Sequence, residues 1–274
     1  MTYTEISFPA LGLTLNPDRY IQLGPMRVYY YGLIIAMGLV LAVTYCCRRS
    51  RQFGLKDDDI LDGVLWITPF AILCARAYYV VFKWENYASN PISALYIWEG
   101  GLAIYGGIIG AVIGMIVYSK ARKLRLTAVL DVISLGFFIG QSIGRWGNFM
   151  NREAFGAETD VLWKMGLLHS SGKVIYVHPT FLYESLWNLC GLVIFHQVSK
   201  KRKYDGQIAL CYAFWYGLGR AFVEGLRADS LYIGPFRVSQ MLAAVSCITA
   251  AGFLLWNHFR PHDPQKLYVN QQNQ

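Results

Sequence analysis

Seven apolar runs, separated by shorter polar stretches, follow one another along the chain. A helix needs about 20 predominantly apolar residues to cross the hydrocarbon core of a bilayer, and each run reaches or approaches that length. The pattern therefore predicts an all-α fold, that of a polytopic membrane protein with about seven transmembrane helices. The predicted spans are residues 29–47, 60–82, 102–118, 128–143, 180–198, 207–223 and 238–256.

The composition agrees with lipid as the solvent for most of the chain. Hydrophobic residues make up 55% of the 274 residues, and charged residues make up only 15%. One soluble core cannot bury that much apolar surface. A soluble globular protein is therefore disfavoured, and we expect that the net charge of +8 does not reflect nucleic-acid binding.

The basic residues gather in clusters between the apolar runs, an arrangement that indicates membrane topology as the reason for the positive charge. The clusters follow the first, third, fifth and seventh runs, within residues 48–56, 120–125, 200–203 and 260–266. Short loops rich in lysine and arginine stay on the cytoplasmic side of a membrane. We therefore expect an external N-terminus and a cytoplasmic C-terminus.

A single membrane-embedded domain over residues 1–274 is the expected organisation. Residues 1–27 carry three prolines and no signal-peptide pattern, so we interpret them as an external segment at the membrane surface. Residues 144–179 form the longest polar loop, which we place outside the membrane, where it could form a small cap. Residues 260–274 are predicted to be a cytoplasmic tail.

Cysteines and glycines inside the apolar runs favour packing over chemistry. The six cysteines show no CxxC pair and no cysteine–histidine cluster at metal spacing, so we expect no disulfide, no metal and no cofactor. Gly106, Gly110 and Gly114 recur at every fourth position, a spacing typical of closely packed transmembrane helices.

Ionisable residues within apolar runs are the first candidates for chemistry, because a charge at the centre of a membrane helix costs about 2.5–3.5 kcal/mol. Arg220, Glu224 and Arg227 stand at helical spacing at the outer end of the sixth run. Tyr216 extends the same face by one turn. A self-contained ion pair between Arg220 and Glu224 explains this stripe as well as a binding site does.

The run Gly-Arg-Trp-Gly-Asn-Phe-Met-Asn-Arg-Glu at the outer end of the fourth span favours a binding site. It contains Arg145, Asn148, Asn151 and Glu153. Guanidinium groups bind phosphate oxygens through a planar fork of donors, so arginines from two helices can clamp a phospholipid headgroup. For Arg152, by contrast, snorkelling towards lipid headgroups is a sufficient explanation.

Two further features carry weaker signals. Gly100 and Gly101 open the third run, where free backbone N–H groups favour an anion, although a plain turn is the simpler interpretation. Thr180 is predicted to cap the fifth helix after Pro179. Glu184 follows about one turn later, and a role at membrane depth is open for it.

Taken together, these residues resemble the bacterial prolipoprotein diacylglyceryl transferase family. The run from Gly144 to Glu153, with Gly156 following, is similar to the defining motif of that family almost position for position. The resemblance extends from Gly24 to the end of the seventh run. Further matches in the same order are Tyr31-Gly32-Leu33, Gly100-Gly101-Leu102, Gly106-Gly107, His178-Pro179-Thr180, Tyr183-Glu184, and Tyr216 with Arg220, Glu224 and Arg227.

The resemblance implies an enzyme of the bacterial cytoplasmic (plasma) membrane with seven spans and an active site towards the external side. Such enzymes transfer the diacylglyceryl group of phosphatidylglycerol to a cysteine thiol in a prolipoprotein signal peptide. The expected partners are therefore phosphatidylglycerol, the signal peptide and the lipid bilayer. Glycerol phosphate is the expected leaving group.

Roles for individual residues follow from this resemblance. Arg145 and Arg220 are the expected phosphate clamp, which stabilises negative charge as the phosphate leaves. Glu224 is expected to position Arg220. The expected substrate-binding set is Tyr31, Gly100, Gly101, Arg145, Asn148, Asn151, Glu153, Tyr216, Glu224 and Arg227.

One position departs from the family pattern. Many members carry a histidine where this chain has Tyr105, before the second glycine pair of the third run. Histidine is a natural base near pH 7, whereas tyrosine has an ordinary pKa of about 10. Tyr105 joins Arg145 and Arg220 as a catalytic candidate, and the group that takes the thiol proton stays open.

A transporter with an externally open polar site is the competing hypothesis, because intramembrane charges also mark substrate paths. The chain shows no internal repeat, and its polar candidates gather at outer helix ends rather than at mid-membrane. A purely structural scaffold leaves the polar residues unexplained. The transferase is therefore the favoured interpretation.

Overall fold

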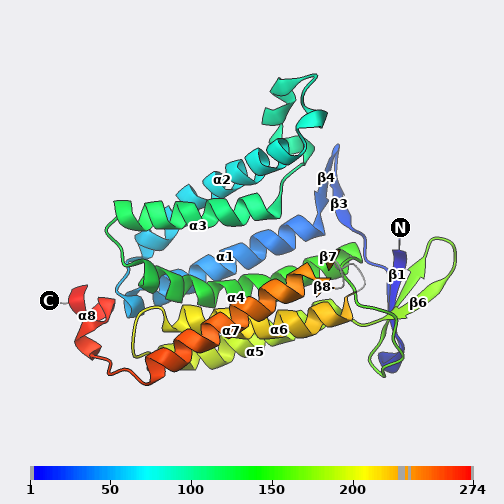
Figure 1. Ribbon diagram of the computed structural model, residues 1–274. Helices are drawn as coiled ribbons and strands as arrows, with labels where there is room; N and C mark the ends of the chain where they lie inside the picture. Colours follow the sequence, from blue (N-terminus) through cyan, green and yellow to red (C-terminus); the bar gives the residue numbers. More distant parts are fainter. Residues whose placement is uncertain (1–2, 228–231, 234–235, 273–274) are drawn as a thin grey trace.

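Long helices dominate the computed structural model, which describes residues 3–227, 232–233 and 236–272 (Figure 1). Within that part of the chain the long helices are α1 (Tyr30–Ser50), α2 (Asp57–Phe82), α3 (Ile104–Ala121), α4 (Leu126–Asn151), α5 (Thr180–Ser199), α6 (Gln207–Leu226) and α7 (Val238–His258). Each coincides with one predicted apolar run, so the positions of these helices were predicted correctly. Five of them, α1, α2, α3, α4 and α7, are long and apolar enough to cross a membrane, counted over the described residues.

Helix α4 is the centre of the bundle and packs against both α1 and α5. Its residues Val132, Leu135 and Phe138 are fully buried in a cluster that also includes Phe195 of α5 and Ile208 of α6. This core fixes the first half of α4 relative to α5 and α6. We call the end where α4 finishes the Arg145 end of the bundle, and the end where α4 begins the Arg125 end.

Helices α2 and α3 pair closely with each other and form a hairpin beside α1 (Figure 1). Two glycines of α3 allow this approach. A Cβ on Gly106 would lie 2.6 Å from the Cys74 carbonyl oxygen, and a Cβ on Gly110 would lie 2.5 Å from Cys74 Cβ. Gly114 faces Phe70 in the same interface. The predicted packing role of the three glycines is confirmed.

Replacing Gly106 with alanine should destabilise the protein by about 1–3 kcal/mol, because overpacking a tight contact forces backbone shifts. Gly107→Ala is the matched control, since its new Cβ would lie 3.7 Å from the nearest atom, the Cβ of Ala75. Thermal unfolding of both purified variants in detergent measures the difference. Equal unfolding midpoints for the two variants would contradict the packing role.

A small antiparallel sheet at the Arg145 end was not predicted from the hydropathy pattern. Its strand order is β2-β1-β5-β6, and Ile6, Leu167 and Val177 form its buried core. The strands are β1 (Tyr3–Phe8), β2 (Leu13–Leu15), β5 (Met165–His169) and β6 (Val174–Val177). The fold is therefore mainly helical rather than all-α, and residues 3–8 form one strand of this sheet, which we call the sheet cap.

Two hairpins precede helices. The first, of β3 (Tyr20–Leu23) and β4 (Met26–Tyr29), leads into α1, and Gly24 has the positive φ of +60° that favours glycine in its turn. The second, of β7 (Tyr232–Ile233) and β8 (Phe236–Arg237), leads into α7. The remaining short elements are η1 (Pro9–Leu11), η2 (Arg51–Phe53), η3 (Trp84–Asn86), η4 (Pro91–Leu95), η5 (Ile97–Glu99), η6 (Pro264–Lys266) and α8 (Tyr268–Gln272).

Candidate functional site

Helix α4 continues to Asn151, beyond the predicted end of the span at residue 143. Arg145 and Asn148 therefore lie on the helix, about one turn apart on the same face, rather than in the loop after it. Arg152 follows in the left-handed conformation, with φ +56°, and closes the helix. The motif thus presents its polar groups from the end of a packed helix.

Glu184 of α5 lies at the centre of a cluster of arginines. Its Oε2 is 2.5 Å from Arg145 Nη2 and 3.5 Å from Arg220 Nη1. Its Oε1 is 3.8 Å from Arg227 Nη1. Only 6% of Glu184 is exposed. One buried carboxylate therefore brings together guanidinium groups from α4 and from the end of α6.

Arg220 has a second carboxylate partner one turn further along α6. Its Nη2 is 2.6 Å from Oε2 of Glu224, which is almost fully buried. Arg237 donates a hydrogen bond to the Glu224 backbone carbonyl. The predicted pair between Arg220 and Glu224 is confirmed, but it is not self-contained, because Arg220 also contacts Glu184 on another helix.

The amides of the motif connect Arg145 to Glu153. Asn148 Nδ2 donates to Glu153 Oε1 at 3.0 Å, and Asn151 Nδ2 donates to the same oxygen at 3.3 Å. On its other side, Asn148 Oδ1 accepts from Arg145 Nη1 at 3.5 Å. The guanidinium group of Arg145 therefore contacts Asn148 through Nη1 and Glu184 through Nη2, and Glu153 holds both amides.

Glu184 is the site residue that sequence reasoning left out of the candidate set. The signal was available, because a glutamate inside an apolar run must be paired or face water. Its neighbours along α5 include no arginine or lysine within one turn. The partners come from α4 and α6 and beyond, so spacing along the chain could not identify them.

Arg152 does not reach towards lipid, and the snorkelling explanation is wrong. Its Nη2 donates to the backbone carbonyls of Thr4 and Pro17 and to Oδ1 of Asn16. Burial lowers the pKa of Arg152 from its ordinary value, and the positive charge of Arg19 adds to this effect. The side chain therefore attaches the N-terminal segment to the end of α4.

The segment before α5 is held by the loop that follows the motif. Thr180 Oγ1 donates to the Ala154 carbonyl at 2.7 Å and does not cap α5, so the predicted cap is wrong. The N–H of Gly156 donates to the His178 carbonyl at 3.0 Å. A Cβ on Gly156 would lie 2.6 Å from His178 Cβ. Glycine at this position therefore permits the approach that sets the start of α5 beside the motif.

Two tyrosines of the predicted substrate-binding set lie on the helices of the site. The ring of Tyr31 packs against Gly147, whose added Cβ would lie 2.9 Å from Tyr31 Cδ2. The ring of Tyr216 stacks on Tyr212 with centroids 5.7 Å apart. Neither Tyr31 nor Tyr216 uses its hydroxyl in a hydrogen bond within the described residues, so both hydroxyls are available as donors.

Gly100 and Gly101 belong to a different arrangement. Their carbonyls accept from Nη1 of the buried Arg76 at 2.5 and 3.1 Å. The N–H of Gly100 donates to the Ile97 carbonyl, so it is not free for an anion, and the turn interpretation fits better. Tyr105, in the first turn of α3, is half exposed, and its hydroxyl makes no hydrogen bond within the part of the chain described.

The geometry of the cluster suits an anionic ligand with several oxygens. The Arg145 and Arg220 side chains keep 21% and 18% of their surface exposed, whereas the Glu184 and Glu224 side chains keep 8% and 2%. The carboxylates thus hold the guanidinium groups from inside the protein and leave part of each donor fork accessible. Such forks bind phosphate oxygens with high directional preference.

Comparison with known proteins finds similarity over almost the whole chain. A family model described as "Prolipoprotein diacylglyceryl transferase" matches residues 19–256. A relative from Bacillus cytotoxicus, named phosphatidylglycerol–prolipoprotein diacylglyceryl transferase, is 41% identical over 255 residues, which cover 89% of this chain and 94% of the relative. A relative of the same name from Bacillus cereus is 43% identical over 254 residues with the same coverage. The family model spans most of the chain, and relatives that are 41% and 43% identical cover 89% of it, so the chain belongs to the prolipoprotein diacylglyceryl transferase family.

Proposed function

We propose that this protein transfers the diacylglyceryl group of phosphatidylglycerol to a cysteine thiol in the signal peptide of a prolipoprotein, the first step of lipoprotein maturation. The observation that carries this proposal is the convergence of Arg145 and Arg220 on Glu184 at one end of an apolar helical bundle. The names of the relatives, which state phosphatidylglycerol and a prolipoprotein, support the identity of donor and acceptor.

The proposed reaction exchanges one bond for another at a glyceryl carbon. The cysteine sulfur attacks the carbon that carries the phosphate ester, and a carbon–sulfur bond forms as the carbon–oxygen bond breaks. Glycerol phosphate leaves with the bonding electron pair, and the thiol proton passes to a base or to the leaving phosphate. Negative charge grows on the phosphate, where fixed donors lower the barrier most effectively.

Each residue of the arginine cluster has its own role in this reaction. Arg145 and Arg220 hold the phosphate oxygens, and Glu184 sets the separation of the two guanidinium groups. Glu224 positions Arg220 through their 2.6 Å contact. Arg227, held by Glu184 at 3.8 Å, adds positive charge behind the clamp.

The motif amides and the two tyrosines complete the headgroup site. Asn148 and Asn151, both held by Glu153, orient Arg145 and offer carbonyl oxygens to the glycerol hydroxyls. The hydroxyls of Tyr31 and Tyr216 donate to oxygens of the lipid. These contacts bind the substrate and its transition state alike, so we expect them to affect binding more than the chemical step.

The proposal includes seven spans in a bacterial plasma membrane, with the Arg145 end outside and the Arg125 end in the cytoplasm. The basic clusters support this orientation, since α1, α3, α5 and α7 all end, and α4 begins, at the Arg125 end. A cysteine at Lys164, in the sheet cap, should therefore react with an impermeant thiol reagent on intact cells, and a cysteine at Lys201 should not.

This labelling experiment uses a background without the six native cysteines, and both positions should react after the membrane is permeabilised. Labelling of Lys201→Cys but not Lys164→Cys in intact cells would mean that the orientation is inverted. The proposed external active site would then be wrong as well.

We expect the Tyr105 hydroxyl to donate a hydrogen bond to a phosphate or glyceryl oxygen of the lipid. Tyr105→Phe should therefore lower the transfer rate about 10-fold to 100-fold, or about 1.4–2.8 kcal/mol, the cost of one lost hydrogen bond to a charged group. A substrate thiol beside Arg145 and Arg220 ionises more readily than the ordinary cysteine pKa of about 8.5 implies, so no dedicated base is needed. Tyr105→His should remain active. Measurement of both variants across pH tests this, and complete inactivity of Tyr105→Phe at every pH would make Tyr105 the proton acceptor.

The function itself is tested by transfer of a labelled diacylglyceryl group. Purified protein in phosphatidylglycerol vesicles should label a synthetic signal peptide on its cysteine, and the same peptide with serine at that position should stay unlabelled. Absence of transfer, together with movement of a solute across the vesicle membrane, would support the transporter hypothesis instead.

A further inference from the structure

A second polar cavity lies at the Arg125 end, at the opposite end of α4 from the arginine cluster. Its volume is about 560 Å³, within the range of small-molecule binding sites. It opens between the start of α4, the turn that joins α5 to α6, and the chain that follows α7. The polar lining includes Arg125, Lys203, Asp205, His262, Asp263 and Lys266.

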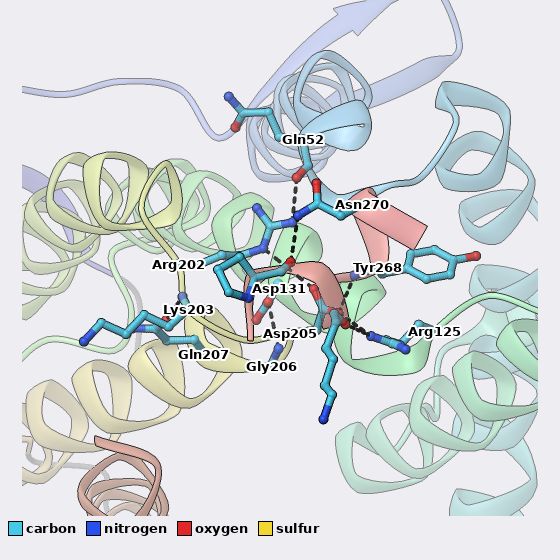
Figure 2. Close-up of polar contacts among 12 residues, drawn as sticks. Gln52, Arg125, Asp131, Arg202, Lys203, Asp205, Gly206, Gln207, Tyr268 and Asn270 are labelled. Atoms are coloured by element: carbon cyan, nitrogen blue, oxygen red, sulfur yellow. Dashed lines mark hydrogen bonds and ion pairs between the residues drawn. The ribbon is translucent and has the colours of Figure 1, made fainter. Parts of the chain in front are cut away.

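The wall formed by the C-terminal segment is firmly attached to the bundle. Asp205 Oδ2 accepts from Arg125 Nη1 at 2.9 Å and from the Tyr268 N–H at 2.8 Å (Figure 2). Arg125 also donates to the Lys266 carbonyl at 2.6 Å. Gly54 touches the backbone of Val269 so closely that an added Cβ would lie 2.8 Å from its Cα. Tertiary contacts therefore hold the C-terminal segment in place as one wall of the cavity.

The charges in this cavity are incompletely paired. The amino groups of Lys203 and Lys266 make no hydrogen bond or ion pair within the described residues. The Asp205 side chain, only 4% exposed, is used within the protein: its Oδ2 pairs with Arg125 at 2.9 Å and its Oδ1 lies 3.8 Å from Arg202 Nε. The cavity thus offers two cationic donors, together with the exposed carboxylate of Asp263 as an acceptor.

An aromatic pair adds a neutral donor to this wall. The ring of Tyr204 stacks on the His262 ring with centroids 4.7 Å apart. Burial raises the pKa of Tyr204 to about 12, and Cys211 and Asp131 add to this effect. The Tyr204 hydroxyl therefore stays protonated near neutral pH and can donate to an anion.

We propose that this cavity binds the glycerol phosphate headgroup of a phosphatidylglycerol molecule in the leaflet at the Arg125 end, as a second lipid site separate from the reaction. Lys203 and Lys266 contact the phosphate, because basic pockets at the ends of membrane helices hold anionic headgroups. The glycerol hydroxyls donate to Asp263. A headgroup with both phosphate and hydroxyls satisfies the cations and the carboxylate at once, which phosphatidylcholine cannot do.

Native mass spectrometry of the full chain in detergent tests this site by counting bound lipids during a titration with phosphatidylglycerol. We expect two tight lipids for the unchanged protein, one per site. In the K203Q/K266Q variant one of them should bind at least roughly tenfold more weakly, as expected for two lost charge contacts. Transfer to a signal peptide should stay within about twofold of the unchanged protein.

The matched control is K56Q/K120Q, which removes two exposed lysines at the same end but outside the cavity. It should bind both lipids normally. Added glycerol 3-phosphate distinguishes a lipid headgroup from a soluble phosphate ester as the ligand. If the site binds lipid, phosphatidylglycerol should stay bound in excess glycerol 3-phosphate. If glycerol 3-phosphate displaces the lipid, the site binds the soluble ester instead. Unchanged lipid binding by K203Q/K266Q, or equal binding of phosphatidylcholine, would overturn the proposal.

Discussion

Replacement of Arg145 by lysine should lower the rate of diacylglyceryl transfer by about 100-fold to 1,000-fold although the positive charge is kept. Loss of one preorganised donor to a developing negative charge costs roughly this much in other enzymes. A lysine ammonium is a point charge and cannot reproduce the planar fork, which here contacts Glu184 at 2.5 Å and Asn148 at 3.5 Å at the same time. The loss should appear mainly in kcat, because the fork acts on charge that develops in the transition state.

The control for this variant is Arg122→Lys, which changes an arginine at the opposite end of the bundle. Arg122 is paired with Asp59 and Asp62 at the surface, and about half of its side chain is exposed, so its replacement should leave transfer nearly unchanged. Comparable amounts of folded protein must be shown for both variants. A transfer rate within about fivefold of normal for Arg145→Lys would reduce Arg145 to a general electrostatic contact.

Replacement of Glu184 by glutamine should lower the free energy of unfolding by about 3–5 kcal/mol, since it breaks a buried charge cluster and removes the carboxylate that pairs with Arg145. Arg145, Arg220 and Arg227 all lose a shared carboxylate, whereas the volume of the side chain hardly changes. The unfolding midpoint should fall by on the order of 10 °C. Activity should fall as well, because the two clamp arginines lose the group that sets their separation.

Two further variants separate this effect from a general loss of negative charge. Glu158→Gln removes an exposed carboxylate in the loop between α4 and α5 and should leave the unfolding midpoint unchanged. Glu184→Asp keeps the charge but moves it by one methylene, so it should recover part of the stability and less of the activity. If Glu184→Gln unfolds at the same temperature as the unchanged protein, Glu184 is not the centre of the charge cluster.

The helical part of the fold was predictable because a long apolar run indicates directly that a helix of that length is surrounded by lipid. The apolar runs at 29–47 and 60–82 became α1 and α2 with ends shifted by only a few residues. The glycine spacing in α3 was equally informative, since residues four apart on a helix share a face. Family motifs are local too, so the run from Arg145 to Glu153 could be recognised without any structure.

The sheet cap could not be predicted in the same way. Its strands are three to six residues long, and β1 pairs with β5 from the opposite half of the chain. Short strands carry little hydropathy signal, and nothing local specifies such a distant partner. Arg152 shows the consequence, because its role in holding Thr4 and Pro17 exists only once the N-terminal segment meets the middle of the chain.

The candidate site was likewise predictable only in part. The sequence by itself determined which residue types are present at the helix ends and predicted the pair between Arg220 and Glu224, because that pair lies within one turn of one helix. Only the tertiary structure decided that Glu184 would join Arg145 to Arg220, since those three charges come from three helices. The physical reason is that a charge in an apolar bundle must find a partner, but packing alone determines which helix supplies it.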